Sequence, residues 1–368
     1  MFAKGNCDNL ISGKRRSMNT DLLKRLTEAH GVPGQEDAIR DIVKQELKGI
    51  CEFHTDKMGS LHCVKKASKS GKSVKKLMIA AHMDEIGFVV KYIDDKGFIR
   101  LQTLGGWDPR QMNAQRVFVH TKEGPRNGVL MYGTKPKHML TDAEAGAKQD
   151  TNNFFVDTGL SGEEAKAKIR IGDMVTMNRT FQQMGDLSTC KAMDDRVGLY
   201  VMIEALKACK DHGVEVHAVA TVQEEIGLRG AAASGSAIQP DICIALDITL
   251  ANDIPGIPEQ DHVTKLGAGA AIKFLDSSLI CHPKVFEHFR TIAEKKKIKH
   301  QIEILPAGGT DAGAIQRLHG GIPSLTLSIP TRYVHTVNET VHNGDVDACV
   351  DLLARYIEDA DKGEYGYE

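Results

Sequence analysis

The chain has 368 residues, 41% of them hydrophobic, and its 47 lysine and arginine residues nearly balance its 49 aspartate and glutamate residues. This near-neutral charge disfavours nucleic acid as a partner, because phosphates are bound by basic surfaces. No apolar run approaches the roughly 18 residues that a membrane-spanning helix needs, so we expect a soluble, cytoplasmic protein with no membrane partner. The eight cysteines show no CxxC pairs, which favours reduced core thiols over a zinc ribbon or a disulfide framework.

The first part of the chain contains an extension, two predicted helices and a strand. Residues 1–17 lack the apolar stretch of a signal peptide, and we expect a disordered extension there. Apolar residues recur at helical spacing over residues 20–29 and 35–48, and Gly31 and Gly49 mark where each helix stops. A short apolar strand over residues 77–81 then leads directly into His82.

The pattern changes between residues 86 and 184, where apolar and polar residues alternate in short runs. Examples are "FIRLQTL", "QRVFVHT" and "GDMVTMN", which are separated by turn signals such as "DDKG" and "EGPRNG". Short alternating segments with frequent turns predict β-strands. We therefore expect a small all-β unit at residues 86–185.

Strands and helices alternate again after residue 190. The predicted order is a helix at 197–209, strands at 214–222 and "DICIALDI", a helix at 283–297, strands at "HQIEILP" and "IPSLTLSI", and a helix at 346–360. This alternation predicts an α/β fold with a mostly parallel sheet sandwiched by helices. The β unit therefore interrupts one α/β domain, formed by residues 18–85 and 186–368.

Carboxylate and imidazole residues stand at successive strand ends of this predicted sheet. Each has an ordinary structural explanation on its own: a helix N-terminal acid, a turn aspartate, a core histidine or a solvated pair of glutamates. Open α/β sheets, however, bind their ligands where the strands end. The residues that gather there are His82, Asp84, Asp194, Glu224, Glu225, Asp247 and His335.

Binding of two divalent cations is a function that these residues could share. Two imidazoles and three carboxylates are a suitable ligand set for two ions about 3.5–4 Å apart, and the cations would offset the cost of burying the acids. The set consists of His82, Asp194, Glu225, Asp247 and His335. Zinc and cobalt fit it, and manganese also accepts it.

Two carboxylates, Glu224 and Asp84, are not needed as metal ligands in this set. If Glu225 binds a metal, its neighbour Glu224 is free to take and return a proton as a general base. Asp84, two residues after His82, is placed to accept a hydrogen bond from that imidazole and fix its tautomer. A simple turn aspartate is the alternative for Asp84.

Ordered motifs over nearly the whole chain after Met18 resemble those of the tetrahedral aminopeptidases and the related glutamyl and deblocking aminopeptidases, metallopeptidase family forty-two. They are "HMDEIGF", "GVLMYGTKPKH", "FFVDTG", "KAMDDRVG", "VQEEIGLRGA", "ALDITLANDIPG", "GGTDAGAI" and "TRYVHT". The resemblance implies that Asp194 bridges two metal ions. It also implies that His82 and Asp247 complete one metal site, that Glu225 and His335 complete the other, and that Glu224 is the base.

The same resemblance implies a phosphorylase/hydrolase-like peptidase domain that hydrolyses short peptides. The insert at 86–185 would be a small β-barrel that forms dimers, which assemble into a dodecamer. Two departures from the family pattern, Ala270 and the Thr336–Val337 pair after the last histidine, affect the shape of the substrate pocket.

Other functions remain open on the same ligands. A carboxypeptidase, amidohydrolase or deacylase would use the same metal site, because the ligands do not determine which end of a substrate is bound. A glycosidase needs only two carboxylates and would leave the histidines idle. A non-catalytic binding protein would be expected to have lost at least one ligand.

Overall fold

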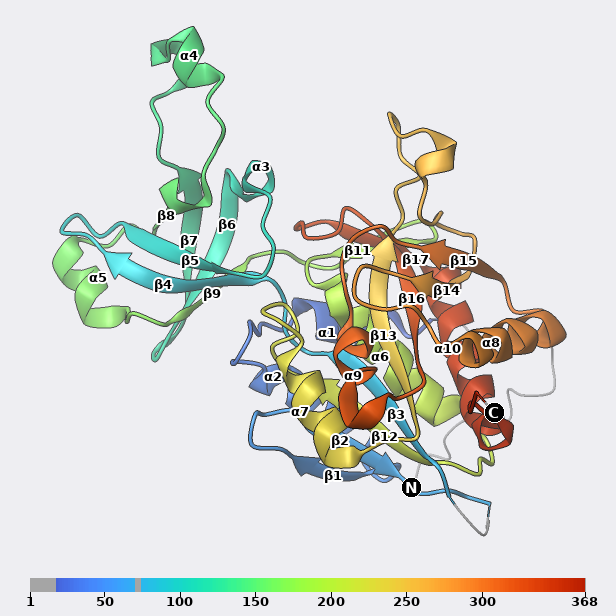
Figure 1. Ribbon diagram of the computed structural model, residues 1–368. Helices are drawn as coiled ribbons and strands as arrows, with labels where there is room; N and C mark the ends of the chain where they lie inside the picture. Colours follow the sequence, from blue (N-terminus) through green and yellow to red (C-terminus); the bar gives the residue numbers. More distant parts are fainter. Residues whose placement is uncertain (1–17, 70–73, 368) are drawn as a thin grey trace, which may run out of the picture.

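The computed structural model describes residues 18–69 and 74–367, so the extension predicted at 1–17 lies outside the described residues. The chain forms a large α/β unit and a smaller β-barrel that projects from one side of it (Figure 1). The predicted α/β fold with a β-barrel is therefore confirmed.

The large unit is built on an eleven-stranded sheet, in the order β1-β2-β12-β3-β13-β16-β17-β11-β10, with β14 beside β16 and β15 beside β14. The four central strands, β12, β3, β13 and β16, are parallel, whereas β1, β2, β10, β11 and β17 pair in an antiparallel manner at the flanks. The predicted parallel pairing thus holds for the centre, and short connections account for the antiparallel pairs β1·β2, β10·β11 and β16·β17. The strands are β1 (Glu52–Thr55), β2 (Leu61–Lys65), β3 (Lys76–His82), β10 (Gln182–Met184), β11 (Leu187–Cys190), β12 (Glu215–Thr221), β13 (Ile242–Leu250), β14 (Ala270–Leu275), β15 (His300–Ile304), β16 (Ser324–Arg332) and β17 (Glu339–His342).

Helices cover both faces of the sheet, because the side chains of a strand alternate between faces. In β3, Leu77, Ile79 and Ala81 belong to one core, while Met78 and Ala80 belong to the other. Helices α1 (Thr20–Glu28), α2 (Asp37–Glu46), α6 (Met193–Ala208), α8 (Pro283–Lys296) and α10 (Asn343–Asp359) contribute to the first core. Helices α7 (Arg229–Ile238) and α9 (Asp311–Ile315) contribute to the second.

The barrel is closed, with neighbouring strands in the order β4-β5-β8-β7-β6-β9, and it encloses its own apolar core around Phe88, Val117 and Val156. Its strands run from Gly87 to Met177, and the next strand, β10, pairs within the large sheet. The barrel strands are β4 (Gly87–Ile93), β5 (Ile99–Leu104), β6 (Gln115–Thr121), β7 (Gly124–Tyr132), β8 (Phe154–Asp157) and β9 (Met174–Met177). Short helices α3 (Pro109–Met112), α4 (Asp142–Ala145) and α5 (Gly162–Lys168) lie in its connections. Single 3-10 turns occur at Lys137–Met139, Thr151–Asn153, Glu259–Asp261, Leu318–Gly320 and Ala360–Lys362.

Within residues 18–69 and 74–367, no helix is both long enough and apolar enough to cross a membrane. The seven cysteines in the same part of the chain are free thiols, and all except Cys51 are buried. Burial raises the pKa of the Cys63 and Cys243 thiols, which therefore stay protonated and act as small apolar side chains.

Candidate metal centre

The carboxyl ends of the central parallel strands bring the predicted residues together. Strand β3 ends at His82, which lies opposite Thr221 at the end of the neighbouring β12, and Glu224 and Glu225 follow that strand. His335 follows β16, and Asp194 lies in the first turn of α6. Asp247 was predicted to close a strand, but β13 continues to Leu250, so this carboxylate projects from within the strand.

Asp194 lies at the centre of the group. Its Oδ1 atom is 3.0 Å from His82 Nε2, and its Oδ2 atom is 3.3 Å from His335 Nε2, so each carboxylate oxygen faces a different imidazole. His335 Nε2 also lies 3.5 Å from Glu225 Oε1. Two sets of possible ligands share this residue: His82 with Asp194 and Asp247, and Asp194 with Glu225 and His335.

Within each set the ligand atoms lie within 4.8 Å of one another. A third set combines His82 with both glutamates, and Glu224 Oε2 is 3.9 Å from His82 Nε2. The structure therefore brings together all five predicted ligands and the predicted base, while either glutamate is near enough to coordinate.

The donor set fits divalent cations. The side chains of His82, Asp194 and Glu225 are nearly buried, at 2%, 9% and 6% exposed, and carboxylates in such surroundings need compensating charge. Glu225 Oε1 is buried and accepts no hydrogen bond within the described part of the chain. An orphaned carboxylate oxygen between an imidazole and a second carboxylate is the kind of atom that a metal ion satisfies.

The electrostatics of the protein alone show the same deficit of positive charge. Burial raises the pKa of Asp247 well above its ordinary value, and the Asp194 charge adds to the effect. Burial likewise raises the pKa of Glu224, although His82 opposes the shift. Burial favours neutral His335, yet contacts with Asp194 and Glu225 raise its pKa to about 12. Cations at this position would stabilise the charged carboxylates.

Asp84 has a different role from the predicted one. His82 Nδ1 lies 2.9 Å from the backbone carbonyl of Asp84 and 3.6 Å from its carboxylate, so the carbonyl fixes the imidazole. The fully buried Asp84 carboxylate instead accepts hydrogen bonds from the backbone amides of Glu224 (3.0 Å) and Glu225 (3.1 Å). It therefore orients the glutamate pair rather than the histidine.

Glu339, which the sequence analysis missed, plays a matching part on the other side. Its carboxylate accepts hydrogen bonds from the backbone amides of Asp194 (3.0 Å) and His335 (2.8 Å) and is only 1% exposed. Burial and the Asp194 charge raise the pKa of Glu339 to about 8, and a cation at Asp194 would favour the ionised form that accepts both bonds. Its position four residues after His335 was the one available sequence signal.

The barrel also reaches the site, through the loop after β5. A Cβ atom added to Gly106 would lie 3.2 Å from His335 Nδ1, and one added to Gly105 would lie 3.0 Å from Glu225 Oε2 and 2.4 Å from Ile86 Cγ2. Gly105 has φ +80°, a conformation that favours glycine. This close approach explains the glycine pair, whose contact with the site the sequence did not predict.

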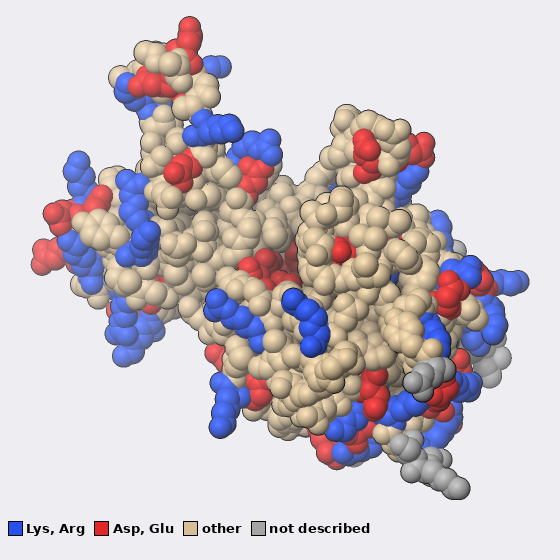
Figure 2. Space-filling model, in the orientation of Figure 1, with Lys and Arg blue, Asp and Glu red and all other residues tan. Residues whose placement is uncertain are grey.

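Acidic side chains gather in the recess between the barrel and the large unit (Figure 2). A cavity of about 580 Å³ opens beside the candidate ligands and extends along β13 and the loop around Gly308. Left-handed backbone at Gln223, Leu228 and His335 accompanies the tight turns around it.

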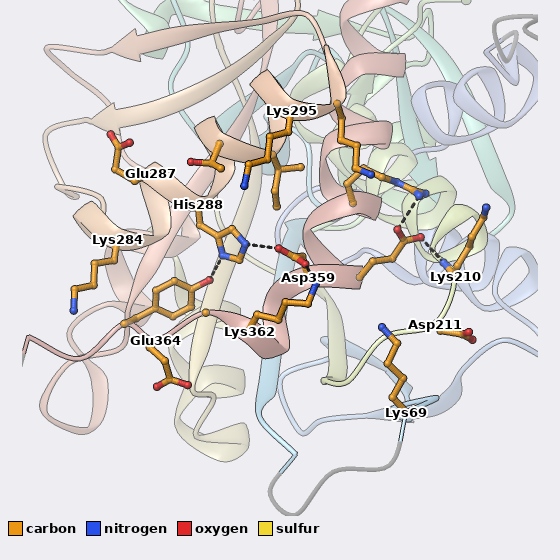
Figure 3. A pocket seen from close by; sticks show the side chains of 17 residues that line it. Lys69, Lys210, Asp211, Lys284, Glu287, His288, Lys295, Asp359, Lys362 and Glu364 are labelled. Carbon is orange, nitrogen blue, oxygen red and sulfur yellow. Dashed lines mark hydrogen bonds and ion pairs between the residues drawn. The ribbon is translucent and has the colours of Figure 1, made fainter.

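A second, larger hollow of about 990 Å³ lies between α8, α10 and neighbouring loops (Figure 3). It is lined by charges of both signs, and His288 is held there by Tyr365 (2.6 Å) and Asp359 (3.1 Å). None of its lining residues belongs to a possible metal-binding group in the described part of the chain. The candidate ligands instead line the smaller cavity.

Known proteins resemble this chain over most of its length. Residues 59–352 match the family described as M42 glutamyl aminopeptidase. The lysyl aminopeptidase of Pyrococcus furiosus is 36% identical over 349 residues, which are 92% of this chain and 96% of that protein. An aminopeptidase structure from the archaeon Desulfurococcus kamchatkensis has a TM-score of 0.86 and 39% identity, covering 92% of this chain and 94% of that one. The TET1 peptidase of Pyrococcus horikoshii, which can assemble into a tetrahedron or a large octahedral shell, has a TM-score of 0.81 and 30% identity over 92% of this chain and 98% of that one.

Proposed function

This chain belongs to the M42 glutamyl aminopeptidase family and is a peptide hydrolase, and we propose that it removes N-terminal residues from short peptides with two divalent metal ions. Asp194 would bridge the ions, His82 and Asp247 would complete one site, and Glu225 and His335 the other. Zinc or cobalt suits these ligands, and manganese is also acceptable.

The observation that carries this proposal is the position of Asp194. Its two oxygens face two different imidazoles at 3.0 and 3.3 Å, and it belongs to two separate ligand sets. A carboxylate shared in this way is what a bridged pair of ions requires.

Glu224 is proposed as the general base. When bound, the metal ions would polarise the scissile carbonyl and make water a stronger nucleophile. Glu224 takes a proton from the attacking water and returns it to the leaving amine as the peptide C–N bond breaks. Glu225, and not Glu224, forms a ligand set with Asp194 and His335, which supports Glu225 as the ligand and leaves Glu224 for the proton transfer.

The described side chains around the cavity offer no free basic group to hold a peptide's carboxylate end. Four acidic residues line it, Asp194, Glu224, Glu225 and Asp247. Among its described lining residues the only lysine or arginine is Lys273, which already pairs with Glu303 at 2.5 Å. A C-terminal carboxylate would therefore find no free cation of the protein.

The two units of the chain are proposed to divide the work. Residues 18–85 and 186–368 would form the catalytic unit, and residues 86–185 the dimerisation unit, except that β10 pairs with β11 in the large sheet and so belongs with the catalytic unit. Exposed apolar side chains on the barrel, such as Tyr92 (56%) and Val129 (45%), favour a covering partner. Dimers would assemble into a dodecamer, because a structure of the TET1 peptidase is described as a dodecamer. The enzyme is also proposed to be cytoplasmic. Chromatography with mass measurement tests the oligomer: a monomeric mass would contradict this part of the proposal.

The central test compares Glu224→Gln with Glu225→Gln. The first variant should keep its metal content but lose about 10²- to 10⁴-fold in kcat on aminoacyl anilides, because only the proton carrier is removed. The second should lose metal as well as activity. Glu259→Gln, at an exposed side chain outside the ligand sets, controls for effects of mutagenesis and purification. Retained turnover in Glu224→Gln would disprove the base, and preferred hydrolysis of N-acetylated substrates would disprove the aminopeptidase function.

A further inference from the structure

The cavity beside the candidate metal centre is where the N-terminal side chain of a bound peptide would lie. One end of it is formed by the candidate ligands and the remainder by β13, β14 and three loops. Aliphatic side chains make up much of this remainder, namely Leu228, Ile248, Leu250, Leu305 and Val334. Such walls favour an apolar side chain, because contact with it removes apolar surface from water.

A buried charge cluster lies against this cavity. Lys273, which lines the cavity from β14, has a fully buried side chain whose Nζ atom is 2.5 Å from Glu303 Oε1 and 3.4 Å from Asp276 Oδ2. The side chains of Glu303 and Asp276 are also fully buried. Thr249, another lining residue, donates a hydrogen bond of 2.7 Å to Glu303 Oε1.

This cluster has more negative than positive charge. One ammonium group faces two carboxylates, and Glu303 Oε2 and Asp276 Oδ2 accept no hydrogen bond from the described residues. An acidic substrate side chain would lose its water here and find the nearby cation already neutralised. The excess negative charge disfavours an acidic side chain more than a basic one, but the Glu303 and Asp276 carboxylates have no exposed surface with which to bind a basic side chain.

We infer that the enzyme prefers peptides with an uncharged, apolar N-terminal side chain, and that Glu303 disfavours acidic side chains because, together with Asp276, it gives the cluster around Lys273 a net negative charge. The inference rests on the proposed aminopeptidase function and adds the substrate class to it. Without the Glu303 charge, Lys273 and Asp276, 3.4 Å apart, would form a balanced pair, and the repulsion of an acidic side chain in the cavity would be relieved.

The test measures kcat/KM for leucyl, lysyl and glutamyl p-nitroanilides. The wild-type protein should hydrolyse them in the order leucyl, lysyl, glutamyl. In Glu303→Gln the leucyl-to-glutamyl ratio should fall by about tenfold or more, a change equivalent to about 1.4 kcal/mol. The change should come mainly from a lower KM for the glutamyl substrate, because Glu303 alters binding and not the reacting atoms.

Asp276→Asn removes the other carboxylate and should move the ratio in the same direction, which covers the case that Glu303→Gln does not fold. Glu294→Gln, on the exposed face of α8, is the matched control and should leave the ratio unchanged.

The outcomes distinguish failure of the inferred substrate preference from failure of the proposed aminopeptidase function. A wild-type preference for the glutamyl or lysyl substrate over the leucyl one would overturn the inference, as would ratios within about twofold of wild type in both variants. In either case hydrolysis of the anilides leaves the aminopeptidase function intact. Absence of hydrolysis with every anilide would instead overturn the proposed function, and the inference with it.

Discussion

Substitution of Glu339 is the most informative perturbation of the ligand framework, because one buried carboxylate accepts hydrogen bonds from the backbones of two proposed ligands, Asp194 and His335. Glutamine offers one oxygen and one NH₂ group, so Glu339→Gln can satisfy only one of the two amides. The loss of one charge-assisted hydrogen bond should lower the free energy of unfolding by about 1.5–3 kcal/mol.

The variant should also bind metal more weakly, by a free energy of similar size. A change in the support of metal ligands typically weakens metal affinity by about 10- to 100-fold, and we expect that range for at least one of the two ions in Glu339→Gln. Glu339→Leu, which satisfies neither amide, should weaken it further. The assay is a competition titration of zinc or cobalt against a chromophoric chelator, with Glu259→Gln as the exposed control.

One result would refute this reasoning. If folded Glu339→Gln bound both ions with affinities within about twofold of wild type, the two hydrogen bonds would have no part in holding the ligands.

Three further predictions follow from the same geometry. Lys191→Met leaves the buried Glu85 without the ammonium 2.7 Å away and should lower the free energy of unfolding by about 3–5 kcal/mol in urea titrations, unlike Lys295→Met at the surface. Burial opposes ionisation of Glu85, but Lys191 and Arg196 lower the pKa of its carboxyl overall. The contribution of Glu85 to stability is therefore present above the unfolded pKa of about 4.3 and is lost as the pH falls through the lower folded pKa. A wild-type stability that rises on acidification through this window would contradict this prediction. Gly106→Ala should reduce kcat/KM by about tenfold by displacing His335, whereas Gly366→Ala, with no atom within 4 Å of the added carbon, should not, and equal effects would exclude a specific contact.

The sequence predicted the elements whose signals are local. Apolar spacing located helices close to α1, α2, α8 and α10 and strands close to β3, β12, β13, β15 and β16. Carboxylates and imidazoles after these strands also predicted which residues would meet, because parallel strands end at one edge of a sheet.

Other features depend on contacts that a single sequence does not display. No helix was predicted between the strands at 214–222 and "DICIALDI", yet the glycine-rich segment after Glu225 leads into helix α7 at Arg229. A Cβ atom at Gly230 would lie 2.5 Å from the carbonyl oxygen of Val222, so the glycine serves close packing of the helix on the strand end and not flexibility.

The sequence also did not predict which side chains hydrogen-bond to the backbone of the site. Asp84 and Glu339 each accept two main-chain N–H groups, and neither role leaves a residue-type pattern in the sequence. The expected imidazole partner of Asp84 was wrong for this reason: residue spacing placed Asp84 beside His82 but did not determine whether its carbonyl or its carboxylate would face the ring.

The central claim is that two divalent ions act in one site bridged by Asp194, and a stoichiometric titration tests it most directly. Metal-depleted protein is titrated with zinc or cobalt while bound metal and leucyl anilide hydrolysis are followed together. The account predicts that full activity needs two ions per chain and that Asp194→Asn, which keeps the shape of the side chain but removes its charge, loses tight binding of both. Full activity with no more than one ion per chain, or normal binding of two ions by Asp194→Asn, would contradict it.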